Sequence, residues 1–242
     1  MKDKKAKMLL LDILLITIGL LYILFLYSDI FDIKMVVSSS ALKYISVVLC
    51  FIITLFIGKD GFGKRDRLLL QIGLFIAILA DLCLLILGYH VLGIALFCLV
   101  QIIYYNRYRG GKACRPPLIF IKFIVIFLLI MVGYFIINLV SVKVDFLFAM
   151  AFFYSACLIF STLESVNAFK NNLYPCYNKY MIIVGMALFL LSDISIAIFN
   201  MSKEFNTCMY NISASLIWGF YLPSQVLLSV SGYRFKRDKK DV

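Results

Sequence analysis

Residues 68–87, LLLQIGLFIAILADLCLLIL, form an apolar run of 20 residues that contains one acidic side chain, Asp81. A second run, residues 180–199, YMIIVGMALFLLSDISIAIF, contains Asp193 in the same way. A helix needs about 20 predominantly apolar residues to cross the hydrocarbon core of a membrane. A carboxylate inside such a helix costs several kcal/mol and is rarely kept unless it has a function in a polar interior. We therefore predict membrane helices over both runs and treat Asp81 and Asp193 as candidate functional residues.

The composition of the 242-residue chain supports this class. Hydrophobic residues make up 64% of the sequence and charged residues only 15%, which is outside the range of soluble globular domains. The net charge of +11 comes from basic residues in short segments between apolar runs, so membrane topology explains it and no nucleic acid partner is predicted. The seven cysteines occur singly, without metal-type spacing, and there is one histidine, His90. We predict neither a metal site nor a cofactor.

Eight apolar runs are long enough to act as spans. We predict an all-α fold, a polytopic membrane helical bundle with eight transmembrane helices in one transmembrane domain over residues 1–242. Short connections at Gly88–Leu92 and at Ser141–Lys143 return the chain directly, so the helices on either side of each are antiparallel. The predicted spans are, in order, about residues 8–27, 41–57, 68–87, 89–105, 117–140, 144–163, 180–199 and 209–231.

The distribution of Lys and Arg predicts the orientation. Nineteen of these residues fall at the two termini and in the even-numbered connections, whereas four fall on the opposite side. By the positive-inside rule, both termini are cytoplasmic. We expect a multi-pass integral protein of a bacterial cell membrane, in contact with the lipid bilayer.

This topology also predicts depth. Asp81 and Asp193 each follow the start of their span by about thirteen residues, or roughly 20 Å, so both lie in the outer half of the bundle. Lys43 opens the second span at the outer side, whereas Gln101, Tyr104 and Gln225 fall nearer the middle or the inner half. The polar groups therefore outline a cleft that runs inward from the two aspartates.

Two ordered blocks around these residues resemble the lysoplasmalogenase family of eight-span membrane proteins. In the first block, ADLCLLIL with Asp81 is similar to the family's G-D-x-x-L, and Gly93, Phe97, Gln101 and Tyr104 follow where the family has G-x-x-x-F-x-x-x-H-x-x-Y. In the second block, FLLSDISIA with Asp193 is similar to F-x-x-S-D-x-x-x-A and is followed by Tyr221 and Gln225, similar to Y-x-x-x-Q. The blocks cover about 100 residues. Ala80 replaces a family glycine, and Gln101 replaces a histidine with a side chain that hydrogen-bonds but does not titrate.

The resemblance implies hydrolysis of the vinyl ether bond of a lysoplasmalogen, a lysophospholipid substrate, to a fatty aldehyde and a glycerophospho-alcohol. Asp81 and Asp193 are then the catalytic pair, one delivering a proton and the other acting as a base or stabilising the cation, without a decision on which is which. Such chemistry resembles that of glycosidases, which also use two carboxyls. Two carboxyls that share a site repel each other when both are ionised, so one is expected to carry a proton at neutral pH. The predicted substrate-binding residues are Lys43, which is placed to hold a phosphate, and Gln101, Tyr104, Tyr221 and Gln225.

Two other interpretations stay open at this stage. The aspartates could be a structural pair that joins helices through hydrogen bonds. Alternatively, the chain could be a membrane transporter or a lipid-binding protein without catalysis, because an aspartate and a glutamine recur in each half, as in a 4+4 duplication. A transporter needs a water path to both faces, whereas an enzyme needs one pocket for an acyl chain. The sequence does not define the oligomeric state.

Overall fold

The computed structural model describes residues 2–33, 35–58, 61–110, 116–140, 143–202 and 206–234. Within these ranges every regular element is a helix, which confirms the all-α prediction. The short element η2 is a π-helix that continues α3. The elements are α1 (Lys2–Phe31), α2 (Ser39–Leu55), α3 (Lys64–Leu82), η2 (Cys83–Leu87), α4 (His90–Tyr108), α5 (Pro116–Leu139), α6 (Phe146–Lys170), α7 (Cys176–Ser202) and α8 (Thr207–Val230).

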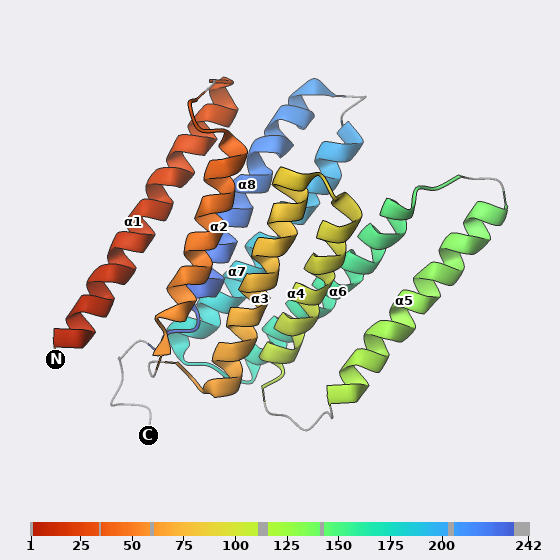
Figure 1. The fold of residues 1–242 in the computed structure, drawn as a ribbon. Coiled ribbons are helices and arrows are strands. Elements are labelled where there is room, and N and C mark those ends of the chain that lie inside the picture. Colours follow the sequence, from red (N-terminus) through yellow and green to blue (C-terminus); the bar gives the residue numbers. More distant parts are fainter. Residues whose placement is uncertain are drawn as a thin grey trace.

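Successive helices run in opposite directions through the bundle (Figure 1). The odd-numbered helices begin at the end where the even-numbered helices finish. We call this the basic end, because Lys64 and Arg65 open α3 there and Arg107 and Lys170 lie in the last turns of α4 and α6. Which side of the membrane this end faces stays a prediction.

Seven helices in the described ranges are long and apolar enough to cross a membrane, which makes the chain a multi-pass membrane protein. The eighth, α2, has 17 residues and spans about 26 Å at 1.5 Å per residue, slightly less than a hydrocarbon core of about 30 Å. The predicted span, residues 41–57, has the same length. Several other helices, α1, α6 and α7 most clearly, extend beyond their predicted ends, because a helix can continue into the polar interface where the apolar run stops.

Six of the helices form a closed ring. Around it, α2 packs on α3, α3 on α4, α4 on α6, α6 on α7, α7 on α8, and α8 returns to α2. The two remaining helices lie outside the ring: α1 packs against α2 and α8, and α5 packs against α6. In Figure 1, α5 stands at one edge of the bundle and α1 at the other. The inward faces of the six ring helices therefore make the core in which polar side chains can be sheltered from lipid.

A proline inside α8 creates a backbone acceptor that α1 satisfies. Pro223 has no N–H, so the carbonyl of Gly219, four residues earlier, loses its helical partner. The Tyr22 hydroxyl of α1 donates to that carbonyl at 2.9 Å. The same contact attaches α1 to the ring, because an unpaired carbonyl in lipid would cost several kcal/mol.

The turn after Asp81 is as tight as the sequence predicts. α3 changes into η2 two residues beyond Asp81, Gly88 ends it with φ +71°, and α4 begins at His90. Gly93 then lets α4 approach η2, since a Cβ atom there would lie 2.5 Å from the Leu84 side chain. π-helical turns often mark functional sites. The second predicted turn, at Ser141–Lys143, lies mostly outside the described residues.

Candidate active site

Asp81 lies inside the ring with one strong hydrogen bond. Its side chain is buried, with 3% of its surface exposed. The Tyr221 hydroxyl, which comes from α8, donates to Asp81 Oδ2 at 2.7 Å across the ring interior. Two of the predicted site residues, 140 positions apart in the chain, are therefore in direct contact.

Asp193 has a matching partner that its local sequence does not indicate. The Tyr154 hydroxyl of α6 donates to Asp193 Oδ2 at 2.6 Å. Its neighbour Ser192 donates to the Ile217 carbonyl of α8 at 3.0 Å, which fixes the rotation of α7. Asp81 is the eighteenth residue from the start of α3, and Asp193 is the eighteenth from the start of α7, so the two helices carry their carboxyls at corresponding positions.

An aromatic cluster of Phe97, Phe189, Tyr154 and Tyr221 connects the two tyrosine–aspartate pairs. The Phe97 ring lies 6.1 Å from the Tyr154 ring and 6.2 Å from the Tyr221 ring, centroid to centroid. Phe189 lies 5.6 Å from Tyr221 in an edge-to-face arrangement. Each carboxyl is thus bonded to its own tyrosine, and both tyrosines pack on the same phenylalanine.

Lys43 is linked to this cluster through a tryptophan. Its ammonium group forms an ion pair with Asp29 at 2.7 Å and lies 5.2 Å from the Trp218 ring and 5.7 Å from the Phe25 ring. Trp218 in turn packs at 5.1 Å on Tyr221, the donor to Asp81. A continuous row of side chains therefore leads from a partly exposed cation to a buried carboxyl.

The other predicted site residues lie deeper toward the basic end. Gln101, Tyr104 and Gln225 have no exposed surface. Gln101 accepts a hydrogen bond from Ser161 at 2.6 Å, and its side chain interacts with the Tyr154 hydroxyl that donates to Asp193. The Tyr104 hydroxyl and both amide atoms of Gln225 have no hydrogen-bond partner among the described residues. These residues are in the ring interior but do not contact the carboxyls through hydrogen bonds.

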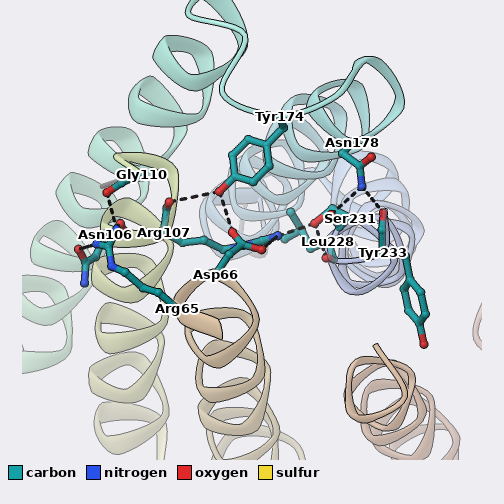
Figure 2. A network of polar contacts seen from close by, with 10 residues as sticks. All are labelled: Arg65, Asp66, Asn106, Arg107, Gly110, Tyr174, Asn178, Leu228, Ser231 and Tyr233. Atoms are coloured by element: carbon teal, nitrogen blue, oxygen red, sulfur yellow. Dashed lines mark hydrogen bonds and ion pairs between the residues drawn. The ribbon is translucent and has the colours of Figure 1, made fainter. Parts of the chain in front are cut away.

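A second polar network closes the basic end of the ring, and of its residues only Arg107 entered the sequence prediction, as one of the basic residues that predict the orientation. The Arg107 guanidinium is fully buried and binds both oxygens of Asp66, at 2.9 and 3.3 Å. It also donates to Ser231 Oγ at 3.1 Å. Figure 2 shows these contacts joining α3, α4 and the end of α8.

Tyr174, in the connection between α6 and α7, completes this network. Its hydroxyl donates to Asp66 at 2.8 Å and is 3.2 Å from the Arg107 carbonyl (Figure 2). Burial raises the pKa of Tyr174 above its ordinary value, so the hydroxyl keeps its proton and stays a donor at neutral pH. Nearby, Asn178 of α7 donates to the Ser231 and Tyr233 carbonyls at 2.9 and 2.6 Å.

Neither Arg107 nor Tyr154 was predicted as a site residue, and each case has a physical reason. The predicted fourth span ended at residue 105, whereas α4 continues to Tyr108 and carries Arg107 onto the buried face three residues after Tyr104. Tyr154 is one of fifteen tyrosines, and nothing in its local sequence shows that its hydroxyl faces α7. Within the described ranges, no three His, Cys, Asp or Glu side chains gather as a metal site would require.

Comparison with known proteins identifies the family. The family model described as YhhN family matches residues 38–232, most of the chain, and the match includes Asp81, Asp193 and all five predicted substrate-binding residues. The searches of curated proteins and of solved structures found no match. The match begins just before α2 and ends just after α8, so it covers the complete six-helix ring together with α5. The chain therefore belongs to the YhhN family.

Proposed function

We propose that this protein hydrolyses the vinyl ether bond of a lysoplasmalogen, with Asp81 and Asp193 as the catalytic carboxyls. The observation that carries the proposal is the arrangement of two intramembrane carboxyls, each hydrogen-bonded to a tyrosine, around one aromatic cluster. Membership of the YhhN family supports it, since the two sequence blocks that carry the resemblance lie inside the matched region.

The chemistry requires a proton and a water molecule. A carboxylic acid protonates the alkene carbon, and the adjacent carbon becomes an oxocarbenium ion. Water adds to that carbon and releases a proton, and the resulting hemiacetal breaks down to the aldehyde and the alcohol of the glycerol. One aspartate supplies the first proton, and the other stabilises the cation or accepts the proton from water.

The residues around the carboxyls suit these steps. Tyr221 and Tyr154 hold the two carboxyls in fixed orientations, as preorganised catalytic groups need to be. The faces of Phe97 and Phe189 provide apolar surface for the alkenyl chain and attract a cation. Lys43 binds the phosphate of the headgroup when it exchanges Asp29 for the substrate.

The proposal is tested by aldehyde release. Purified protein is incubated with a lysoplasmalogen and, in parallel, with an acyl-linked lysophospholipid of the same headgroup. We expect aldehyde from the first lipid only, and loss of that activity in Asp81→Asn and in Asp193→Asn. Asp12→Asn is the matched control, because Asp12 is an exposed aspartate of α1.

Two outcomes contradict the proposal. Release of aldehyde from neither lipid by folded protein would favour a transporter or a lipid-binding protein. Near-normal turnover in either aspartate variant would exclude the two-carboxyl mechanism even if the wild-type protein is active.

A further inference from the structure

The ring interior contains a group of buried polar side chains with unused hydrogen-bonding capacity. We call Gln101, Tyr104, Ser224 and Gln225 the polar layer. All four are completely buried. Among the described residues no protein group pairs with the Tyr104 hydroxyl, Ser224 Oγ or either amide atom of Gln225, and the Gln101 side chain interacts with the Tyr154 hydroxyl.

The position of the polar layer follows from two contacts between α4 and α8. At the level of the carboxyls, Phe97 of α4 packs against Tyr221 of α8. Toward the basic end, Arg107 of α4 donates to Ser231, which follows α8. Ten residues separate the two contacts on each chain segment, about 15 Å along a helix.

The polar layer lies between these two levels. Gln101 and Tyr104 follow Phe97 by four and seven residues, so they share its face of α4. Gln225 follows Tyr221 by four residues and shares its face of α8. Tyr104 also touches α3, where a Cβ atom at Gly73 would lie 2.7 Å from its ring. The layer thus separates the carboxyls from the Arg107–Asp66 network.

The free-energy cost of burying unpaired polar groups indicates that the polar layer needs additional hydrogen-bond partners. A buried polar group without a partner costs about 1–3 kcal/mol, and the layer contains four such atoms: the Tyr104 hydroxyl, Ser224 Oγ and both amide atoms of Gln225. Buried polar groups in folded proteins are usually paired with protein or with bound water, and a buried water binds two to four of them. Lipid chains cannot be the partners of these groups, because they have neither hydrogen-bond donors nor acceptors.

We propose that the polar layer is a binding site for internal water molecules, held between the two carboxyls and the Arg107–Asp66 network. The second part of the inference, which rests on the proposed function, is that this site supplies the water that adds to the oxocarbenium ion. The lipid then approaches the carboxyls from the Lys43 side, and water approaches from the opposite side. The buried Arg107 and Tyr174, together with the partly exposed Asp66, separate this water from the solvent at the basic end.

Synchrotron X-ray radiolysis with mass spectrometry tests the water site directly, because a water bound beside a side chain oxidises that side chain even where bulk solvent does not reach. We expect Tyr104 to be oxidised several-fold faster than Phe25, which is equally buried but packs among aromatic rings. Gln225→Leu removes both unpaired amide atoms at similar volume and should slow the oxidation of Tyr104. The control is Gln71→Leu on α3, whose amide already donates to the Thr54 carbonyl at 2.9 Å; it should leave Tyr104 oxidation unchanged.

The outcomes separate the two parts of the inference from the proposed function. Oxidation of Tyr104 no faster than that of Phe25 would overturn the water site. If Tyr104 is oxidised rapidly, Gln225→Leu should lower kcat for lysoplasmalogen with little change in KM, and an unchanged kcat would overturn the role in water supply. Absence of any aldehyde release by the wild-type protein would refute the proposed function, while the radiolysis result would still decide the water site.

Discussion

The hydrogen bond between Tyr221 and Asp81 gives the most specific prediction. Tyr221→Phe removes one hydroxyl oxygen and keeps the ring that packs on Trp218, Phe189 and Phe97. Asp81 then loses its donor while it stays buried at 3% exposure. A hydrogen bond to a charged group is worth about 1.5–3 kcal/mol, and 1.4 kcal/mol corresponds to a tenfold change in rate. We expect kcat for aldehyde release to fall by about 10- to 150-fold.

The assay compares three single variants. Tyr154→Phe should lower kcat over a similar range, because the Tyr154 hydroxyl is the donor to Asp193 at 2.6 Å in the same way. Tyr180→Phe is the control, since Tyr180 is exposed. Thermal unfolding in detergent verifies that each variant is folded. A Tyr221→Phe protein that is folded and within about twofold of wild-type kcat would refute the view that this bond orients a catalytic carboxyl.

Three further predictions concern topology and stability. An impermeant maleimide added to intact cells should label the exposed Cys208 at the start of α8 but not the exposed Cys176 at the basic end; the reverse pattern would invert the orientation. Arg107→Met should destabilise the protein by about 3 kcal/mol, the lower end for breaking a buried ion pair, because Asp66 keeps its bond from Tyr174; an unchanged melting temperature would contradict this. Tyr22→Phe should lower the free energy of unfolding by about 1 kcal/mol in the wild-type chain. The loss should be smaller in a Pro223→Ala background, where the restored N–H can donate to the Gly219 carbonyl. Equal losses in both backgrounds would show that the proline is not what leaves this carbonyl without a donor.

The helices can be predicted from the sequence because bilayer thickness sets the length of each membrane span, and this length can be recognised in each apolar run by itself. The runs around Asp81 and Asp193 are each 20 residues long, so their presence needs no knowledge of any other segment. The ring order is different, since it depends on which faces of distant helices fit together. The contact of Tyr221 with Asp81 was outside that local information, although the family resemblance had already marked both residues.

Polar residues near helix ends were the hardest to interpret. Lys43 and Arg107 were both counted in predicting the topology, and only Lys43, at the outer start of the second span, was also predicted to bind substrate. In the structure Lys43 lies between two aromatic rings beside Asp29, whereas Arg107 is held by a carboxylate from α3. Their different surroundings come from helix length and packing, which composition does not encode.

The closed order of the ring has a consequence for biosynthesis. Asp81 enters the membrane with α3, but its donor Tyr221 is made 140 residues later, about 7 to 28 seconds at translation rates of 5–20 residues per second. During that interval α2 lacks its neighbour α8, and the carboxyl faces an unfinished bundle. A nascent chain that stops before α8 therefore exposes an unpaired acid within the bilayer, a feature by which membrane quality control can distinguish it from the finished protein.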